Sequence, residues 1–345
     1  MNALRLSICL PVYNFGAFLG QTLDSILVQA GPEVEVVVID GASTDNTGDI
    51  VAQVRAKWPA LRYVRLPQRG GIDVDMALSV DQAQADYCWL FSGDDIMRPG
   101  AVARVLEVIG SGDDVYICRH TICDKEMRFL SDYPVLGTAG VRRFDFADAA
   151  QRQDFLCNAV NTEALFSFMS GLIIRRQAWQ SLPMPTQFMS RCWGHVERLL
   201  TLGALRLNVC YVDEVWLDKR GENDSFMDHG IVNRLRIAVD GYMRLAAAFF
   251  GADSVEAAQV RRYLRNELTI ASFMAARQAC ASDPARESRA ELDRMMDLLY
   301  SDPTAWNRLT RAVYYGFPLW LYGLARHAWR AVRPLVAKRQ FLSMR

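Results

Sequence analysis

Four short apolar runs in the first hundred residues each end in polar or glycine residues, and a helix-like segment follows every run. In chain order they are Leu4–Tyr13, Val34–Asp40, Leu61–Leu66 and Tyr87–Phe91. Runs rich in β-branched and aromatic residues are typical of buried strands, and the segments between them repeat apolar residues at helical spacing. Strands that alternate with helices form right-handed βαβ units. We therefore expect an α/β fold with a mostly parallel sheet and helices on both faces.

The residues that follow these four strands are candidates for a shared binding site. Pro11–Asn14 closes the first strand, Asp40 ends the second, Gly70–Gly71 follows the third, and Asp94 and Asp95 follow the fourth. In open α/β sheets a ligand binds beyond the carboxyl ends of the strands. Separate turns would explain each fragment alone, but their convergence at one edge favours a site.

The acidic pair indicates what the site binds. Asp94 and Asp95 end the apolar run that begins at Tyr87. Buried carboxylates are costly unless they are paired or bound to a cation. The pair therefore indicates a divalent metal and an anionic ligand, for which a nucleotide diphosphate is the best candidate. The alternative is a plain turn over Ser92–Asp95 that caps a helix with Pro99 in its first turn.

Three of these fragments together resemble the family-2 glycosyltransferases of the GT-A fold: Pro11–Asn14, Val38–Thr47 and the pair Asp94 and Asp95. More narrowly, the chain is similar to abequosyltransferase-type enzymes of O-antigen assembly. The segments that carry this similarity are Gly71–Leu78, Cys88–Asp95, His195–Glu197 and Arg220–Phe226. The resemblance implies a GT-A-like (Rossmann-like) fold and an inverting transfer of a sugar, such as the dideoxyhexose abequose. The donor would be a nucleotide sugar, and the acceptor a hydroxyl of a lipid-linked glycan in bacterial surface polysaccharide.

The resemblance also implies roles for the residues of the donor half. Pro11 and Tyr13 would line the donor site, and Asp40 would meet the nucleobase. Asp75 lies in a segment similar to the family's Asp-Ala-Met-Asn helix start, and would contact the donor. The alternative for Asp75 is an exposed acid in a first helical turn, where the helix dipole favours it.

Asp94 and Asp95 are the expected metal ligands. The resemblance implies that Asp94 lies near the ribose or the metal, and that Asp95 holds an Mg²⁺ or Mn²⁺ ion that bridges the two phosphates. Many relatives have a further Asp where this chain has Ser92. This departure predicts a metal dependence weaker than is usual in the family.

The catalytic base is expected at the start of a helix around Cys192–Leu202. An inverting transfer needs a group that removes the acceptor hydroxyl's proton while the diphosphate leaves from the opposite face. The resemblance places an acid at such a helix start, and Glu197 is the first candidate. His195 is the second, because its ordinary pKa also suits base work. The alternatives are a surface glutamate and a histidine at the edge of the core.

Arg220 is a candidate for the departing diphosphate. It lies in a polar segment just after the expected strand Val212–Leu217. A guanidinium keeps its charge and forks onto two oxygens. The alternative is a solvated loop without a ligand.

We expect four segments. Residues 1–110 would form the nucleotide-sugar-binding half, 111–229 the acceptor-binding half, 230–303 a bundle of three helices, and 304–345 a basic aromatic tail. With 51% hydrophobic residues, a chain of 345 can bury a sizeable core. Its eight scattered cysteines suit reduced core residues better than a disulfide framework. The N-terminal residues resemble no secretory signal, which predicts a cytoplasmic protein.

The tail differs from the rest in charge. Residues 304–345 contain eight Lys or Arg and no Asp or Glu, and the preceding 303 residues carry 31 basic against 39 acidic side chains. This division argues against a nucleic-acid-binding protein and for an anionic partner of the tail. Aromatic residues are interleaved with the basic ones, among them Trp306, Tyr314, Tyr315, Phe317, Trp320, Tyr322 and Trp329.

The uncharged run of the tail, Ala312–Ala325, is 14 residues long, and a spanning helix needs ~20. We therefore expect the tail to lie on the anionic inner face of the cell membrane. The alternative is that its aromatic residues pack on the helical bundle or in an oligomer contact. A chain that ends near Asp302 is expected to stay folded.

Two other functions stay open from the sequence. A nucleotidyltransferase also places paired acids at strand ends, but it needs a Gly-rich phosphate loop, which Pro11–Asn14 does not provide. A nucleotide-sugar-binding or membrane-scaffold protein would keep the fold and lack the chemistry. Release of nucleotide from the donor without an acceptor distinguishes an enzyme from such a binding module.

Overall fold

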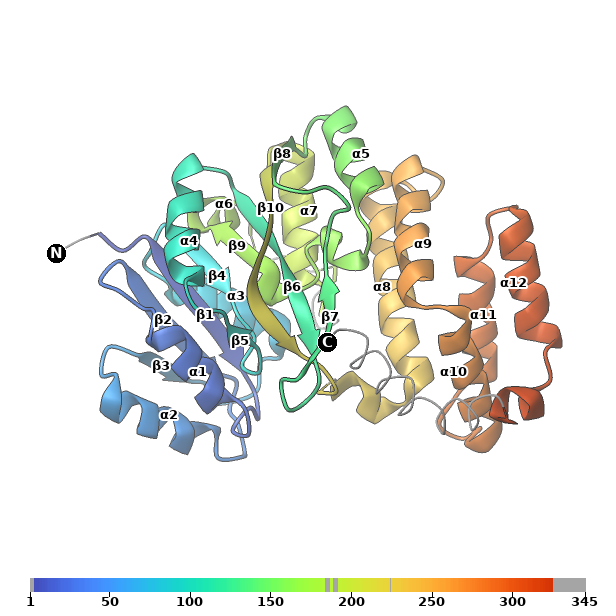
Figure 1. The fold of residues 1–345 in the computed structure, drawn as a ribbon, viewed down its shortest axis with the longest axis horizontal. Helices are drawn as coiled ribbons and strands as arrows, with labels where there is room; N and C mark the ends of the chain where they lie inside the picture. The colour runs from blue at the N-terminus through green and yellow to red at the C-terminus, as the bar shows by residue number, and fades with distance from the viewer. Residues whose placement is uncertain (1–2, 184–186, 189–191, 224, 325–345) are drawn as a thin grey trace, which may run out of the picture. The chain divides into compact units, whose positions relative to one another are not determined.

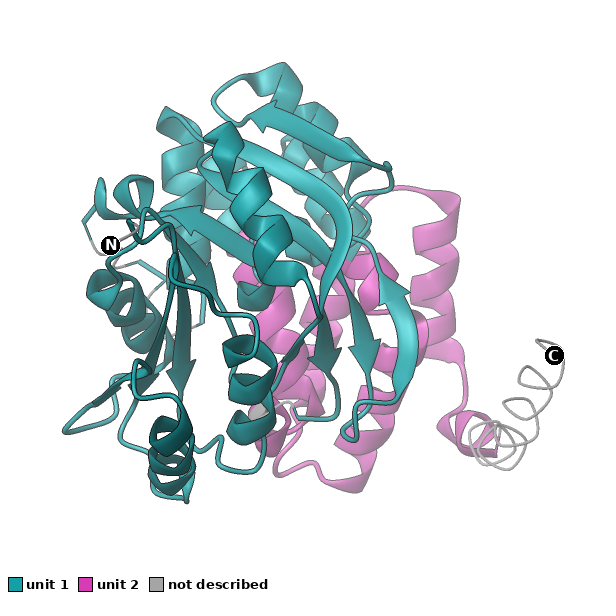
Figure 2. Ribbon diagram, turned by 60° about the vertical axis from the view of Figure 1, so that its left-hand side comes forward, with its two compact units in different colours: residues 1–224, 245–263 teal, residues 225–244, 264–345 magenta. Residues whose placement is uncertain are grey.

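The computed structural model describes residues 3–183, 187–188, 192–223 and 225–324. The chain folds as two compact units (Figure 2). Unit 1 contains residues 1–224 and 245–263, and unit 2 contains 225–244 and the described residues from 264 onward. The helices α8 (Ile231–Phe250) and α9 (Val255–Glu267) therefore contribute residues to both units.

Unit 1 is built on one sheet, whose ten strands in the described residues run in the order β3-β2-β1-β4-β9-β6-β10-β5 (Figure 1). β7 pairs with β6, and β8 pairs with β10. The strands are β1 Leu6–Val12, β2 Val34–Asp40, β3 Arg62–Arg65, β4 Tyr87–Leu90, β5 Ile96–Met97, β6 Val115–Cys123, β7 Phe129–Tyr133, β8 Val141–Asp145, β9 Leu172–Arg175 and β10 Asn208–Arg220.

The first four strands form the parallel half that the sequence predicts. β1 pairs in parallel with β2 and β4, and β2 pairs in parallel with β3. The strand order reverses between β1 and β4, and such a switch point opens a crevice for a ligand. Pro11 lies inside β1, opposite Ile39, although we expected it to close the strand. β1 accepts a proline there because its pairing with β4 already ends at Cys9.

The second half of the sheet is mixed. β9 runs antiparallel to both β4 and β6, and β6 and β10 are parallel. The short strands β5, β7 and β8 are all antiparallel to their partners. The predicted mostly parallel arrangement is therefore found in the donor half, whereas the sheet as a whole is mixed.

Helices cover both faces of the sheet in unit 1. Alternate residues of β1, among them Leu6 and Ile8, share a core with α1, α2 and α4. On the other face, the Cys9 thiol contacts the carbonyl of Ser79 in α3 at 3.5 Å. The helices are α1 Leu19–Leu27, α2 Thr47–Lys57, α3 Ile72–Gln82, α4 Ala101–Val108, α5 Ala149–Asn158, α6 Arg176–Gln180 and α7 Gly194–Leu205.

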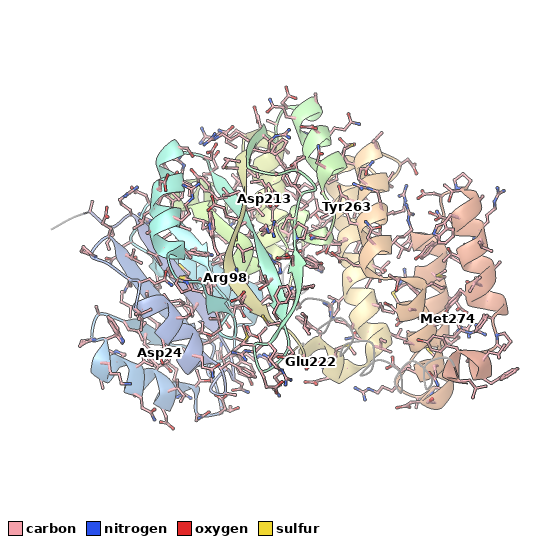
Figure 3. The ribbon with its side chains drawn as sticks, in the orientation of Figure 1. Asp24, Arg98, Asp213, Glu222, Tyr263 and Met274 are labelled. Carbon is pink, nitrogen blue, oxygen red and sulfur yellow. The ribbon has the colours of Figure 1, made fainter. Side chains whose placement is uncertain are left out.

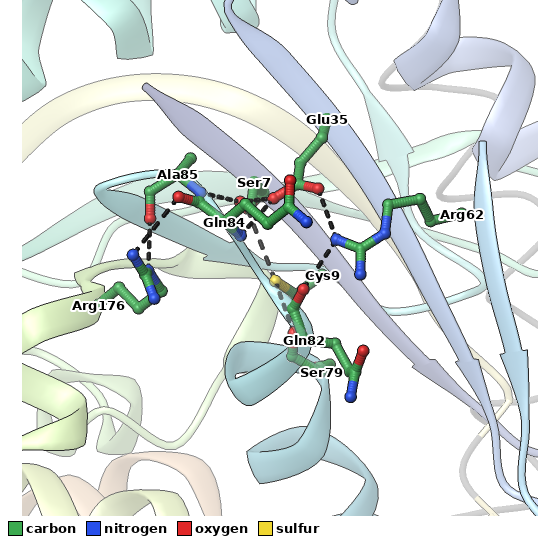
Figure 4. Close-up of polar contacts among 9 residues, drawn as sticks. All are labelled: Ser7, Cys9, Glu35, Arg62, Ser79, Gln82, Gln84, Ala85 and Arg176. Atoms are coloured by element: carbon green, nitrogen blue, oxygen red, sulfur yellow. Dashed lines mark hydrogen bonds and ion pairs between the residues drawn. The ribbon is translucent and has the colours of Figure 1, made fainter. Parts of the chain in front are cut away.

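A buried polar network ties the amino ends of the strands together, at the opposite edge from the predicted site (Figure 4). The carboxylate of Glu35 accepts hydrogen bonds from the Ser7 hydroxyl at 2.5 Å, the Gln84 amide at 2.5 Å and the Arg62 guanidinium at 2.7 Å. The Arg176 guanidinium donates to the carbonyl of Ala85 at 2.7 Å. One carboxylate thus joins β1, β2, β3 and the end of α3.

The helical C-terminal region differs from the expected three-helix bundle. Five helices follow residue 230 in the part of the chain that is described: α8, α9, α10 (Ile270–Ser282), α11 (Arg289–Leu299) and α12 (Ala305–Gly316). One of the three expected helices has its apolar repeat between residues 260 and 274, and it is divided into α9 and α10 because the chain is extended at Thr269. α12 lies in the expected tail, where its Tyr314 is fully buried and donates to Asp293 at 2.6 Å. Because this packing involves a residue after Asp302, it argues against the expectation that a chain ending there stays folded, which no observation tests.

Candidate functional site

Two interlocked loops form the donor edge of the sheet. Asn14 follows β1, its amide donates to the Ser43 hydroxyl at 2.9 Å, and its side chain accepts from the Thr44 amide at 2.8 Å. Asn14 and Ala42 both have positive φ, 60° and 64°. A non-glycine residue in this conformation is uncommon and is often found at functional sites. The hydrogen bonds between the loops hold these strained positions.

Asp40 ends β2 at this edge and is fully buried. Its carboxylate accepts from the Ser43 amide at 2.7 Å and from the Tyr63 hydroxyl at 2.6 Å. Burial, together with this bond to Asp40, raises the pKa of Tyr63. Tyr63 therefore stays protonated and holds the carboxylate in place.

Asp75 lies in the first turn of α3, as the sequence predicts, but it is 3% exposed and not a surface acid. A side chain at Gly41 or at Gly70 would collide with its carboxylate, so both glycines are needed for the close approach. Its Oδ1 has no hydrogen-bond partner. Burial and the nearby charge of Asp40 raise the pKa of Asp75 to about 6, against the opposing effect of Arg69.

Tyr13 and Arg69 form a second pair at the donor edge. The Arg69 guanidinium lies 4.0 Å from the centre of the Tyr13 ring. A cation above an aromatic face is attracted by the ring quadrupole. The pair therefore places a positive charge beside the loop that follows β1.

The acidic pair follows β4 and is almost completely buried, with exposed fractions of 8% for Asp94 and 2% for Asp95. Asp94 accepts from the hydroxyl of Ser92 and from the Asn223 amide at 2.7 Å. Asp95 accepts from the Ser170 hydroxyl at 2.6 Å and from the Arg220 backbone amide at 3.0 Å. Ser92, the departure from the family pattern, thus donates a hydrogen bond to the acid two residues later.

Burial and the negative charge of Asp94 raise the pKa of Asp95 to about 7, although Ser170 and Lys219 favour its ionised form. Each oxygen of the two carboxylates accepts one hydrogen bond, which leaves lone pairs for a cation. Within the described residues, no group of three or more His, Cys, Asp or Glu is arranged to hold a metal. A divalent ion here would need ligands from a bound phosphate, which is how Mg²⁺ is usually held. The donor set therefore fits such an ion.

Arg220 is the last residue of β10, not part of a loop, and only 6% exposed. Its guanidinium donates to the Asp94 carbonyl at 2.8 Å, to the carbonyl of Lys125 and to the Gln21 side chain at 2.9 Å. These contacts rule out a solvated loop. They fix the backbone of the acidic pair, and binding of the diphosphate by Arg220 remains a prediction.

The chain turns away from the sheet directly after Arg220. Glu222, labelled in Figure 3, has a positive φ of 57°. This turn brings Asn223 back to Asp94. The sequence marks the segment as polar but does not show which acid Asn223 contacts.

The start of α7 carries both base candidates, and both are buried. One oxygen of Glu197 accepts from the Phe188 amide at 2.9 Å, and its carbonyl accepts from the Thr201 hydroxyl at 2.7 Å. Neither ring nitrogen of His195 makes a hydrogen bond of ordinary geometry. Burial lowers the pKa of His195, and the charge of Asp73 acts in the opposite direction.

Several site residues were not predicted from the sequence. Ser170 precedes β9 and Tyr63 lies in β3, far along the chain from the acids they contact. Asp73 accepts hydrogen bonds at the start of α7. No local sequence pattern predicts these hydrogen bonds, because they depend on the packing of elements distant in sequence.

The parallel donor half and the acidic residues at its strand ends agree with the resemblance to glycosyltransferases that the sequence suggests. Residues 7–169 match the sequence model of the family described as glycosyl transferase family 2. Over these residues the chain therefore resembles the family 2 glycosyltransferases, as the motifs at its strand ends predict. A particular relative is the abequosyltransferase of Salmonella typhimurium, which is 26% identical over 72% of this chain and 76% of its own length.

Solved structures share the fold. The TarS fragment 1–349 of S. aureus in complex with UDP-GlcNAc has a TM-score of 0.58 at 16% identity, over 90% of this chain and 89% of that one. A mannosyltransferase from Pyrobaculum calidifontis in complex with GDP-Man and Mn²⁺ has a TM-score of 0.53 at 15% identity, over 96% and 88%. These likenesses confirm the predicted GT-A-like fold.

Proposed function

We propose that this protein transfers a sugar from a nucleotide-sugar donor to a hydroxyl of a lipid-linked glycan during the assembly of bacterial surface polysaccharide, with inversion at the anomeric carbon. The observation that carries the proposal is the position of Asp40 and the acidic pair at the carboxyl ends of the parallel strands β2 and β4, with Asp75 of α3 against Gly41 of the donor loops. The similarity to an abequosyltransferase supports the polysaccharide context and makes a dideoxyhexose the first donor to test. The complexes of the structural neighbours with UDP-GlcNAc and GDP-Man support a nucleotide-sugar donor.

Asp94 and Asp95 would hold the divalent ion, Mg²⁺ or Mn²⁺. When bound, such an ion neutralises charge on the departing diphosphate. The Mn²⁺ of the mannosyltransferase neighbour supports this assignment. Ser170, Asn223 and the Arg220 amide would keep the carboxylates oriented, because each already donates to one of them.

We assign the catalytic base to His195 in preference to Glu197, which the sequence favoured. Residues two apart on a helix point about 200° away from each other, so only one of the two side chains can face the donor. Glu197 already accepts from the Phe188 amide, whereas the nitrogens of His195 make only contacts of poorer geometry with the backbone of Phe166 and Ser167. His195 is within electrostatic reach of α3, the helix whose Asp75 borders the donor loops. A neutral imidazole there would take the proton of the acceptor hydroxyl.

The C-terminal helix would hold the enzyme at an anionic membrane surface, close to its acceptor. One stripe of α12 and the residues after it leaves large apolar side chains exposed: Trp306, Leu309, Val313, Phe317 and Trp320. Two arginines accompany the stripe, the exposed Arg308 and Arg311, which pairs with Asp297 at 2.7 Å. Aromatic and basic residues together favour the headgroup level of anionic lipid. The helices in the described residues are too short or too polar to cross a bilayer.

The basic tail residues beyond this stripe, with Trp329, lie outside the described residues: Arg326, Arg330, Arg333, Lys338 and Arg339. Their contribution to membrane binding therefore rests on the sequence alone. An oligomer contact through the exposed stripe is the competing possibility that a membrane-binding experiment must separate.

A screen of nucleotide sugars tests the central proposal. We expect one nucleotide class to raise the melting temperature more with Mn²⁺ than without it, and slow hydrolysis of the matching sugar donor in the absence of acceptor. Asp95→Asn should abolish most of both effects while the protein stays folded, because a neutral amide is a poor ligand for a hard cation. Stabilisation without any hydrolysis would identify an inactive nucleotide-sugar-binding protein. Full activity of Asp95→Asn would refute the metal assignment.

A further inference from the structure

The helix that carries the proposed base takes its N-terminal cap from a residue about 120 positions earlier. The first amides of a helix lack partners within it, and a Ser, Thr, Asp or Asn at the N-cap usually supplies one. α7 has Trp193 at this position, whose side chain makes no capping bond. Instead, Asp73 of α3 accepts from the Gly194 amide at 2.9 Å and from the Cys192 amide at 3.1 Å.

The backbone at the start of α7 is strained as well as capped. Cys192 has a positive φ of 67°, which is uncommon for a residue with a side chain. Such a conformation persists where its surroundings hold it. One oxygen of Asp73 bonds the amide of this strained residue and the other bonds the first helical amide, so the two bonds span the turn that leads into α7.

The carboxylate of Asp73 is 6% exposed and faces the positive end of the α7 dipole. Its charge also reaches the imidazole of His195, the second residue of the helix. On α7 itself the neighbouring charged groups are Glu197, bonded to Phe188, and Arg198, whose guanidinium lies over the Trp179 ring of α6 at 4.6 Å. The backbone of Ser167 and Phe166 also contacts the ring and, like Asp73, acts to raise the pKa of His195.

We infer that Asp73 is a positioning residue that fixes the start of α7, and with it His195, relative to the donor edge. The inference rests on the proposed function, in which His195 is the base. α3 suits this task because its Asp75, two residues further along, lies against Gly41 and Gly70 of the donor loops. One helical turn thus contacts the donor loops through one acid and the base-bearing helix through another.

Asp73→Asn tests the inference, because it keeps one hydrogen-bond acceptor and removes the charge. We expect kcat to fall by roughly 10- to 100-fold, a part of what a positioned base contributes, with the donor KM changed by less than about twofold. The acid limb of the kcat profile should move to lower pH, since loss of the Asp73 carboxylate lowers the pKa of His195. Asp49→Asn, an exposed first-turn acid of α2, is the matched control and should change neither.

Two readouts do not depend on turnover. The amides of Cys192 and Gly194 should exchange with solvent at least about tenfold faster in Asp73→Ala than in the parent protein, while amides of the β1 core keep their protection. An NMR titration of His195, assigned with His195→Ala among the four histidines, should show the lowered pKa in Asp73→Asn. An unchanged titration together with an unchanged kcat would overturn the inference. If the parent protein does not bind or does not hydrolyse the donor, the proposed function is refuted instead.

Discussion

Asp40 ends a buried strand, and Asp94 and Asp95 come shortly after another, so their position at one edge of the sheet could be predicted from the order of the chain. What each acid contacts could not. Ser170 and Arg220 bond Asp95 from positions 75 and 125 residues away. Contacts of this kind depend on the mixed half of the sheet, whose strand pairing no local pattern reveals. The sequence therefore predicted where the acids lie, but not which groups donate hydrogen bonds to their carboxylates.

The two base candidates differ in their contacts, and these differences separate their expected variants. His195→Ala should lower kcat by a factor on the order of 10² to 10⁴, the contribution of a positioned base, with donor affinity little changed. Glu197→Gln should cost less turnover, because its main contact is with the Phe188 amide, and an amide oxygen can still accept that bond. Steady-state kinetics with donor and acceptor varied separately measures both. If Glu197→Gln abolishes transfer and His195→Ala retains it, the roles are reversed.

The raised pKa of Asp75 predicts that the stability of the protein depends on pH. Its pKa is about 6 in the folded protein, above the ordinary value of an aspartate, so the native state holds a proton that the unfolded chain has released. Its contribution to stability is therefore complete below pH ~4 and is lost as pH rises through about 6. Asp75→Asn should raise the free energy of unfolding by roughly 1 to 3 kcal/mol at pH 7.5 relative to its effect at pH 4. Denaturant unfolding at both values measures this difference. An equal effect at the two pH values would contradict it, and Asp49→Asn should show no such dependence.

At the scale of elements, the strands and helices of the first hundred residues could be predicted because each strand is bounded by polar residues and each helix has a clear apolar repeat. The later strands could not be ordered. β9 and β6 look like ordinary apolar runs, yet β9 enters the sheet between β4 and β6 and runs antiparallel to both. In the C-terminal region the apolar repeat runs through Thr269, where the backbone becomes extended, so one predicted helix is two.

The network around Glu35 joins three strands of the donor half and predicts a stability effect of the opposite sign to that of Asp75. Burial acts to raise the pKa of Glu35, but hydrogen bonds from Ser7, Gln84 and Arg62 outweigh it and lower the pKa. The stabilisation is therefore present above the unfolded pKa near 4.3 and is lost as pH falls. Glu35→Gln should cost roughly 1 to 3 kcal/mol at pH 7, because Arg62 loses its charged partner.

The neighbouring pair of Glu33 with Arg5 is the matched control for this prediction. Their side chains are 35% and 39% exposed, and the pair is 3.3 Å apart. An exposed ion pair contributes less than ~1 kcal/mol, so Glu33→Gln should have a small effect. Thermal or denaturant unfolding at pH 7 and pH 4 compares the two variants. Equal losses would show that the buried network has no special role in holding β1, β2 and β3 together.

At the scale of the whole molecule, neither compact unit is a single continuous stretch of the chain. Residues 245–263 belong to the unit that contains the sheet, and the residues on either side of them belong to the other unit. α12 belongs to the second unit and buries Asn307, Thr310 and Tyr314. The aromatic residues of the predicted tail therefore divide into two sets. Tyr314 packs within its own unit, as the alternative to membrane binding requires, whereas Trp306 and Trp320 are 71% and 66% exposed.

This division predicts which aromatic residues bind lipid. Replacing Trp306 and Trp320 together by Ser should weaken binding to anionic liposomes by about tenfold or more at low salt, since burial of even one large apolar side chain contributes ~1.5 kcal/mol. Donor hydrolysis and melting temperature should stay the same, because neither side chain is part of a core. Liposome co-sedimentation over a range of salt and lipid charge measures the effect. Val28→Ser, at a residue 73% exposed in the first unit, is the control and should bind as the parent protein does. Unchanged liposome binding of the double variant would refute the membrane role of the stripe. If the double variant instead changed from oligomer to monomer, the stripe would be a contact between copies of the chain.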